Sequence, residues 1–240
     1  MLKVLAQYAG ASKDERVEPA MAQYFMCLRN GLETSPLQMW AKFRWGEYLI
    51  PLIWFAERRP CPLFGEIASL LHSQGYNWTD HFTYFQIEGK IRHIPNLATH
   101  VVNHAMAAKY PALWGLFSGV KEDLEGSGRA MQMLDRFHGC ATGLFTGDEH
   151  LSGLNPSQGT ELCAVVEYMY SLETLISFFG DAAYGDRLES LAYNNLPGAF
   201  TADMWAHQYN QQANQAQCTV EKRDWTNGAD ANIYGLAPNY

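Results

Sequence analysis

The sequence predicts an all-α protein that is built from helical hairpins. Apolar residues recur at the spacing of an α-helix through most of the chain, and the alternating pattern of a β-strand is nearly absent. In addition, a helix that ends in a small turn with an acidic residue and leads into a second helix occurs three times, at 10–14, 119–123 and 180–181. Repeated helix pairs are typical of hairpins stacked side by side in toroids and solenoids. The alternative is an ordinary helical globule with short connections.

The composition limits the classes of partner. With 240 residues, the chain is long enough to bury a core as one large domain or two small ones. A net charge of −8 argues against nucleic acid or an anionic membrane as a partner. Aromatic residues make up 13% of the chain and charged residues only 18%, which suits a domain with an aromatic-lined pocket. No run of eighteen apolar residues occurs, so we expect no helix that spans a membrane.

The cysteines and the two ends of the chain bear on its location and completeness. The five cysteines are an odd number, lie far apart and form no C-x-x-C pair, so they do not indicate a disulfide framework. Met1 leads directly into an amphipathic helix without a signal peptide. We therefore expect a cytoplasmic location, with a secreted parent protein as the alternative. A start without a helix cap and an end without a closing element indicate that the chain is cut from something longer.

The first half of the chain is predicted to contain five helices. Their expected ranges are 2–9, 17–28, 36–59, 63–73 and 97–109. Met21 and Phe25 recur on one face of the second helix. Ser35 is a good N-cap and Pro36 suits the first helical position, so we expect the third helix to start there. The aromatic stretch 76–95 is expected to be irregular.

The second half is predicted to contain four helices. Their expected ranges are 113–117, 120–137, 163–179 and 182–193. Gly126 and Gly128 interrupt the second of these. The third is the most apolar helix of the chain, and Gly180-Asp181 turns it into the last one. Beyond Pro197 the helical period fades, so we expect no further helix.

The stretch 147–163 concentrates groups that transfer protons or bind metals. Within seventeen residues it holds three acids, a histidine and a thiol, and glycines and a proline break any helix there. Glu149 lies in a glycine-containing loop between helices, which is a common place for a catalytic group. A carboxyl group there can act as a general acid or base if its surroundings raise its pKa. The alternative is a solvated loop acid.

Glu161 and Cys163 follow at the start of the most apolar helix. Thr160 is a plausible N-cap, which places both residues in the first helical turn, where they can converge around the open N-terminus. There the helix dipole and the free amides favour a carboxylate and a thiolate. Carboxylate oxygen and cysteine sulfur both bind zinc. Two ligands do not complete a zinc site, however, and a single cysteine at the start of an apolar helix usually belongs to the core.

His100 and His104 are one turn apart on the predicted helix 97–109. This spacing can bind a metal, but Val101, Val102 and Asn103 between them exclude the zinc-protease motif H-E-x-x-H. We expect one of the two histidines to face a pocket and the other to be hydrogen-bonded in the core. No phosphate-loop, dinucleotide-binding or nucleophile-elbow motif is present.

Four segments of the chain are informative when they are considered together, although each alone is weak evidence. They are Gly147–Leu151, Gly159–Cys163, Asp203–Tyr209 and Asn232–Asn239. Together they resemble the catalytic domain of the β-L-arabinofuranosidase-like glycoside hydrolases of family 127, along essentially the whole chain. The resemblance implies that residues 1–240 form a single, incomplete (α/α)6 barrel with a few short strands or irregular loops at its pocket end. It also implies that the first barrel helices and the β-sandwich domains of relatives are absent from this chain.

The same resemblance implies a reaction and assigns residues to it. In that family a carboxyl group protonates the leaving oxygen, and a zinc-bound cysteine is the nucleophile of a retaining hydrolysis. By position, Glu149 matches the acid/base, while Glu161 and Cys163 match two of the four zinc ligands. The substrate-binding residues implied by the resemblance are His100, His150, His207 and Tyr209.

The resemblance also implies which parts of the site are missing. The nucleophile and the other two zinc ligands are expected from a cysteine pair just after the segment that matches Pro238-Asn239, where this chain ends. We therefore expect a fragment that is inactive by itself, is marginally stable and binds its cofactor, zinc, only weakly. Its expected partner is a carbohydrate, an L-arabinofuranoside or a related sugar. A non-catalytic carbohydrate-binding or structural remnant of a helical toroid is the alternative.

Overall fold

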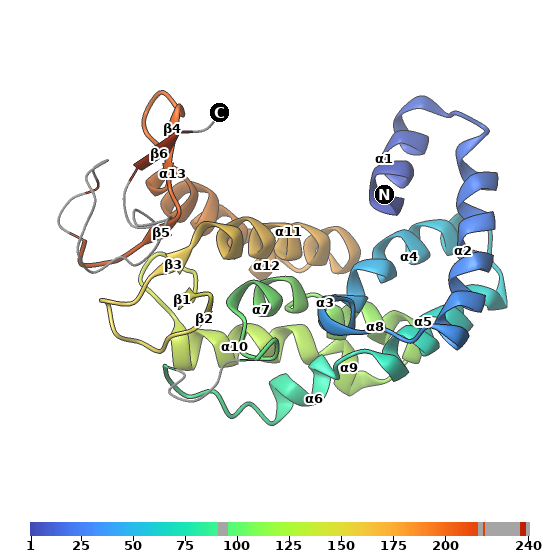
Figure 1. The fold of residues 1–240 in the computed structure, drawn as a ribbon, viewed down its shortest axis with the longest axis horizontal. Coiled ribbons are helices and arrows are strands. Elements are labelled where there is room, and N and C mark those ends of the chain that lie inside the picture. The colour runs from blue at the N-terminus through green and yellow to red at the C-terminus, as the bar shows by residue number, and fades with distance from the viewer. Residues whose placement is uncertain (91–95, 216–217, 219–235, 239–240) are drawn as a thin grey trace. The chain divides into compact units, whose positions relative to one another are not determined.

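A computed structural model describes residues 1–90, 96–215, 218 and 236–238 (Figure 1). The chain is mostly helical, which confirms the predicted all-α class. It divides into two compact units. The first unit contains Met1–His81 and Tyr110–Ser127, and the second contains Phe82–Lys109 and Gly128–Tyr240.

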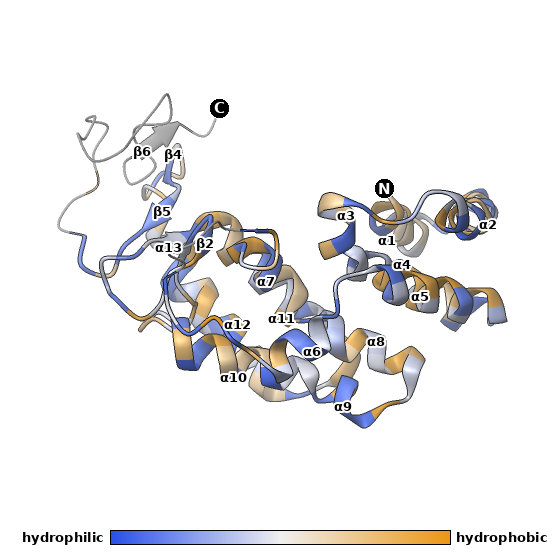
Figure 2. Ribbon diagram, turned by 60° about the horizontal axis from the view of Figure 1, so that its bottom comes forward, coloured by the Kyte–Doolittle hydropathy of each residue, from blue (hydrophilic) through white to orange (hydrophobic). Residues whose placement is uncertain are grey.

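The first unit is an assembly of helices around an aromatic core. Its helices are α1 (Leu2–Ser12), α2 (Val17–Thr34), α3 (Met39–Phe43), the 3-10 turn η1 (Trp45–Tyr48), α4 (Leu49–Arg58), α5 (Pro62–Gln74), α8 (Tyr110–Ser118) and α9 (Lys121–Leu124). The rings of Phe25, Phe55 and Phe64 meet edge to face, with centroids 5.3 to 5.5 Å apart. Figure 2 shows the hydrophobic stretches of α4 and α5 that contribute to this core.

The predicted helix 36–59 is wrong as a single element. Ser35 ends α2 instead of starting a new helix, because its N–H donates to the carbonyl of Gly31 at 2.7 Å. The chain then forms α3, η1 and α4 in succession. Pro51 explains the late start of α4, since it lies in the first turn, where a backbone N–H has no partner within the helix.

The predicted irregular stretch 76–95 contains a short helix, α6 (Trp78–Thr83), that lies across the division between the units. Asn77 caps it by accepting a hydrogen bond from the Asp80 N–H at 3.0 Å. Trp78 and Phe82, four residues apart, are both buried. The helical spacing of these two rings is the signal that the expectation of an irregular loop overlooked.

The second unit combines helices with small sheets. Its helices are α7 (Val101–Ala107), most of α10 (Gly126–His138), α11 (Leu162–Phe179), α12 (Ala182–Ser190), the π-helical turn η2 (Leu191–Asn195) and α13 (Leu196–Gly198). α11 packs mainly on α7 and α12, and its Tyr168, Leu172 and Leu175 are fully buried. Among the described helices, α11 is the one whose length and composition would suit a membrane span. Part of this helix is buried, on the side that packs on α7 and α12.

The expected helices of this region are present with different bounds. The predicted helix 97–109 begins later, because His100 is the N-cap of α7 and residues 97–99 form turns. The predicted helix 120–137 is split into α9 and α10 near the glycines named above. The predicted helix 182–193 changes to the π-helical turn after Ser190.

Two short sheets were not resolved by the sequence pattern. One has the strand order β2 (His150–Leu151), β1 (Gly147–Asp148), β3 (Thr160–Glu161) and β5 (Asn210–Gln211). The other pairs β4 (Ala206–Gln208) with β6 (Leu236–Pro238). Thr160 is therefore in a strand and not the N-cap of α11, and Glu161 is the cap residue. Of the segment Asn232–Asn239, residues 232–235 and 239 lie outside the described residues.

The three predicted hairpin turns are present. Lys13 and Gly119 end α1 and α8 in the left-handed conformation, with φ of 57° and 67°. Gly180 ends α11 with φ of 67°, a conformation that glycine adopts without steric cost. Asp181 then caps α12 by accepting from the Ala183 N–H at 2.9 Å. The helices on the two sides of each turn pack on each other, in the pairs α1–α2, α8–α9 and α11–α12.

Candidate functional site

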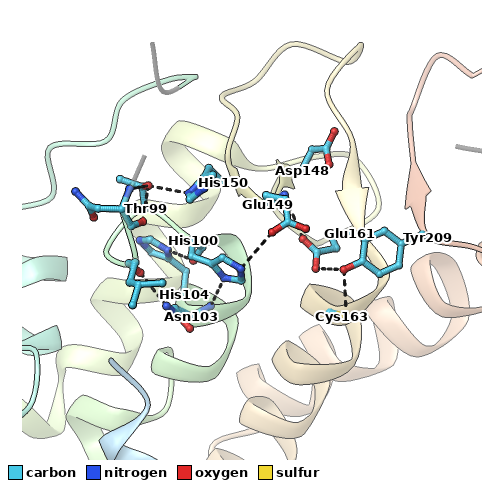
Figure 3. A network of polar contacts seen from close by, with 12 residues as sticks. Thr99, His100, Asn103, His104, Asp148, Glu149, His150, Glu161, Cys163 and Tyr209 are labelled. Carbon is cyan, nitrogen blue, oxygen red and sulfur yellow. Dashed lines mark hydrogen bonds and ion pairs between the residues drawn. The ribbon is translucent and has the colours of Figure 1, made fainter. Parts of the chain in front are cut away.

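The hairpin β1–β2 lies directly against the N-terminus of α7. Gly147 makes this approach possible, because a Cβ atom there would lie 2.3 Å from Cγ2 of Val101. The Val101 N–H donates to the carbonyl of Glu149 at 3.0 Å, and the Leu151 N–H donates to the carbonyl of Thr99 at 3.1 Å. These contacts bring Glu149 next to His100 (Figure 3).

Glu149 is held by its backbone while its side chain remains accessible. Its φ of 62° is left-handed, which costs a residue other than glycine about 1 kcal/mol. Its N–H donates to Oε2 of Glu161 at 3.2 Å, so both of its backbone polar groups are bonded. Its side chain is 63% exposed and places Oε2 3.6 Å from Nε2 of His100. The carboxyl group is thus positioned and open to a ligand.

His100 is oriented by the helix that it caps. Its Nδ1 accepts a hydrogen bond from the Asn103 N–H at 3.4 Å, so the proton of the neutral ring is on Nε2, which faces Glu149. His104 points instead into the core, where it is fully buried and its Nδ1 donates to the carbonyl of His100 at 2.9 Å. His104 is therefore the expected core histidine, while His100, expected at a pocket, is 7% exposed and faces Glu149.

Glu161 is the most buried acid of the group. Only 2% of the residue is exposed, and its carboxylate accepts hydrogen bonds from the Glu149 N–H and from the hydroxyl of Tyr209. Burial raises the pKa of Glu161; the Tyr209 hydrogen bond lowers it, and the nearby charge of Glu149 raises it. A cation beside this carboxylate would remove the cost of burying its charge.

Cys163 lies in the first turn of α11, as predicted, and is exposed. Its Sγ is 3.5 Å from the hydroxyl oxygen of Tyr209. Desolvation by the surrounding atoms raises the pKa of the thiol, the Tyr209 hydrogen bond lowers it, and the charge of Glu161 raises it. The expected thiolate at the helix N-terminus is therefore not favoured by these residues alone. A bound cation would be needed to stabilise it.

Tyr209 joins the two residues that match zinc ligands. It follows β4, and its carbonyl accepts from the Leu162 N–H at 2.8 Å, which ties it to the start of α11. Burial raises the pKa of its hydroxyl, so it remains a donor to Glu161. The resemblance had implied a contact with sugar for Tyr209, and the structure adds this contact with Glu161 and Cys163.

The two remaining predicted residues occupy different elements. His150 is on β2, where its Nδ1 is 2.9 Å from Oγ1 of Thr99 and its ring centroid is 5.8 Å from that of His100. His207 is on β4, and its ring centroid is 6.4 Å from that of Phe200.

Sequence reasoning missed the polar residues that support the site. Asn210 donates through Nδ2 to Oδ1 of Asp148 at 2.8 Å and is fully buried. This bond ties β5 to the hairpin that carries Glu149. Nothing in the amide-rich sequence around Asn210 distinguishes it from its neighbours, because its role depends on the pairing of β5 with β3.

The described residues offer part of a metal site. A carboxylate oxygen and a thiol sulfur that both contact one phenol are close enough to share an ion, and this pair of donors suits zinc. Within the part of the chain that the structure describes, no group of three or more His, Cys, Asp or Glu side chains is arranged to hold a metal. Glu161 and Cys163 supply two donor types that zinc accepts, which is two fewer than a tetrahedral site requires.

Chemically, the site places an accessible carboxyl group beside a histidine and next to a pair of metal-binding donors. Comparisons with protein-family models, with curated proteins and with solved structures gave no match for this chain.

Proposed function

We propose that this chain is part of a retaining glycoside hydrolase that resembles the β-L-arabinofuranosidase-like enzymes of family 127. Glu149 is its acid/base, and Glu161 and Cys163 hold zinc together with two ligands from outside the described residues. The substrate is an L-arabinofuranoside or a related sugar. On this proposal the nucleophile also lies outside the described residues, and the polypeptide 1–240 is inactive by itself.

One observation carries the proposal. Glu149, Glu161 and Cys163, which the resemblance assigns to three roles, converge around the backbone of Glu149 and the hydroxyl of Tyr209. Residues of a loop, a strand end and a helix start have no need to converge if each is a solvated acid or a core thiol. Their convergence supports a shared site.

The solvent exposure of each side chain suits the role proposed for it. The side chain of Glu149 is accessible and can reach the leaving oxygen of a bound glycoside, while His100 presents Nε2–H on one side of it. Glu161 is buried and has its two oxygens engaged, so it suits a fixed ligand rather than a proton carrier. Zinc, when bound, keeps a cysteine sulfur deprotonated and in place. His150, His207 and Tyr209 would contact the sugar or position its neighbours.

We also propose that the helical hairpins belong to an incomplete (α/α)6 barrel. The hairpins α1–α2, α8–α9 and α11–α12 supply the repeated unit of such a barrel. The short strands β1, β2, β3 and β5 carry or adjoin the candidate site, which is where the resemblance expects strands or irregular loops.

The test compares the chain as it is with a chain that continues into the gene sequence after codon 240. Both are assayed with 4-nitrophenyl β-L-arabinofuranoside and related furanosides, in the presence of zinc. We expect no turnover by residues 1–240 and turnover with retention of configuration by the longer chain. In the longer chain, Glu149→Gln should lower kcat at least a hundredfold, whereas Glu189→Gln, an exposed acid on α12, should not change it.

Three results would contradict the proposal. Turnover by residues 1–240 that is lost in Glu149→Gln would show that no outside nucleophile is needed. A longer chain that binds the sugar without hydrolysing it would favour the non-catalytic carbohydrate-binding alternative. Zinc binding to the longer chain can be measured by competition with a chelator. If it is unchanged by both Glu161→Gln and Cys163→Ser, other residues hold the metal.

A further inference from the structure

The second unit contains a cavity of about 420 Å³ that the proposed function does not use. Small-molecule sites typically have volumes of about 300–1,000 Å³. It is lined by Gly139, Cys140, Ala141, Thr142, Thr146, Leu154, Pro156, Gln158, Thr160, Asn195, Gln211, Gln212 and Ala213. Its walls thus come from the loop after α10, the segment between β2 and β3 with Thr160 of β3, the end of the π-helical turn, and β5 with the residues just after it.

The cavity lies on the other face of the sheet from the candidate site. Thr160 and Glu161 are successive residues of β3, so their side chains point to opposite faces. Glu161 contacts the backbone of Glu149 and the hydroxyl of Tyr209, whereas Thr160 lines the cavity. Gln211 pairs with Thr160 in the register of β3 and β5 and lines the cavity with it. The two sites are therefore separate.

Asn195 places a buried amide in the wall of the cavity. It lines the cavity, only 1% of the residue is exposed, and neither Oδ1 nor Nδ2 of its side chain has a hydrogen-bond partner among the residues that the structure describes. Leaving a buried polar group unpaired costs about 1–3 kcal/mol. Asn195 is also the last residue of the π-helical turn, and such turns are rare and frequent at functional sites. A ligand with both donors and acceptors would satisfy this amide.

The other polar side chains of the cavity restrict the class of ligand. Apart from the Cys140 thiol they are hydroxyl and amide groups, and none of the described lining residues carries a charged side chain. Gln211 and Gln212 are held in place, because their Nε2 groups donate to the carbonyls of Asn195 and Ser157 at 2.7 and 2.6 Å. Leu154 and Pro156 add apolar surface. This combination suits an uncharged molecule with several hydroxyl groups and a carbon face.

We propose that this cavity, referred to below as the Asn195 cavity, binds a small uncharged polyhydroxylated molecule, such as a monosaccharide or a polyol. On binding, the amide of Asn195 turns into the cavity and bonds two hydroxyl groups of the ligand through Oδ1 and Nδ2, while Thr160 and Gln211 contact it from β3 and β5. The site does not depend on zinc or on Glu149.

The experiment measures binding of L-arabinose and xylitol to the 240-residue chain by isothermal titration calorimetry. L-arabinonate and glucosamine, which carry a charge, serve as comparison ligands. We expect one equivalent of each neutral probe to bind, with at least tenfold weaker binding of both charged probes. Asn195→Leu should weaken binding of the neutral probes at least tenfold. The matched control is Asn194→Leu, since Asn194 is exposed on the same turn and bonds to Ser190, and it should bind as the wild type does.

Further variants keep the test decisive. If Asn195→Leu does not fold, Thr160→Val removes one hydroxyl from the cavity and should weaken binding severalfold. Glu149→Gln and Cys163→Ser should leave this binding unchanged. Loss of binding in these two variants but not in Asn195→Leu would place the sugar at the candidate site and overturn the Asn195 cavity proposal. Absence of any binding of the neutral probes, or equal binding of charged ones, would also overturn it, and neither result bears on hydrolysis by Glu149.

Discussion

The two units of this protein bury different chemistry. In the first unit the core is dominated by aromatic and aliphatic side chains, with Phe25, Phe55 and Phe64 at its centre. Among the residues that the structure describes, Asp123 and Ser127 are the only buried polar or charged side chains assigned to this unit. The second unit buries many more, including His100, Asn103, His104, Lys109, His138, Glu161, Asn195 and Asn210.

This difference indicates that the second unit accepts a less stabilising core in order to hold polar and reactive side chains. Burying apolar area stabilises a fold roughly in proportion to the area removed from water, whereas each buried polar group requires a partner to break even. The candidate site and the Asn195 cavity both lie in the unit with many buried polar groups. Substitutions in each unit can test that contrast.

The first prediction concerns the aromatic core of the first unit. Phe25→Ala should lower the free energy of unfolding by about 3–5 kcal/mol, because it removes a fully buried ring and leaves a cavity between Phe55 and Phe64. Urea unfolding measures this change. Tyr84→Ala, which removes a ring that is 71% exposed, should cost less than about 1 kcal/mol. Equal costs for both variants would contradict the assigned core.

The second prediction concerns His138, a buried histidine of the second unit. Its Nε2 donates to the carbonyl of Ile87 at 2.6 Å and its Nδ1 accepts from the Gly153 N–H at 2.8 Å, so the neutral ring is fully bonded. Burial lowers its pKa from 6.5 to about 4, although the bond to Ile87 opposes the shift. Between these pH values the unfolded chain binds more protons than the folded one. The contribution of His138 is therefore complete above pH 6.5 and is lost as the pH falls towards 4.

The size of this effect is on the order of 3 kcal/mol. Urea unfolding between pH 7 and pH 4 measures it, and His138→Gln should flatten the pH dependence. Desolvation also lowers the pKa of His81, which is partly buried in the first unit, to about 4, so His81→Gln should flatten the same curve. Only His138→Gln should speed amide exchange in the hairpin 146–153, because His138 bonds to Gly153. An unchanged pH dependence in His138→Gln would contradict its assignment as a buried neutral ring.

The third prediction compares an ion pair in each unit. In the second unit, Arg187 binds both oxygens of Asp135 at 2.7 and 2.6 Å and also the carbonyl of Gly143 at 2.8 Å. Arg187→Met should lower the free energy of unfolding by about 1–2 kcal/mol. In the first unit, Arg29 pairs with Glu33 one turn along α2 at 2.9 Å. Arg29→Met should cost about 0.5 kcal/mol or less, and the reverse order in thermal unfolding would contradict the contrast.

The fourth prediction compares two left-handed residues. Lys13 in the first unit and Glu149 in the second have φ of 57° and 62°. Replacing either with glycine should raise the free energy of unfolding by about 0.5–1 kcal/mol, because glycine relieves the strain by more than its flexibility costs in the unfolded chain. Glu149→Gln should give no such gain. Of the two glycine variants, only Glu149→Gly should abolish hydrolysis in a longer, active chain, and a loss of activity in Lys13→Gly would contradict the assignment.

Local patterns were enough to predict much of the helical fold. The apolar period of α11, the turn at Gly180 and Asp181, and the helix-capping chemistry of short segments all depend on residues within one or two turns of each other. The same locality explains the errors. Ser35 has the sequence features of a helix start, but it ends α2 because its N–H donates a hydrogen bond back to the carbonyl of Gly31.

The candidate site was only partly predictable. The stretch 147–163 could be selected because acids, a histidine and a thiol are close in the sequence, and a family resemblance assigned them roles. The resemblance selected Tyr209, but its contact with Cys163, 46 residues away, was not predictable, and Asn210, 62 residues from Asp148, was not selected at all.

What the sequence alone determined is the helical class, the hairpin turns and the set of chemical groups between Gly147 and Cys163. Tertiary structure decided which of these groups meet. Gly147 allows the hairpin to lie on α7, and the pairing of β3 with β5 brings Tyr209 to Glu161 and directs Thr160 towards Asn195. Such pairings join residues that no local period relates, so their result appears only when the chain is folded.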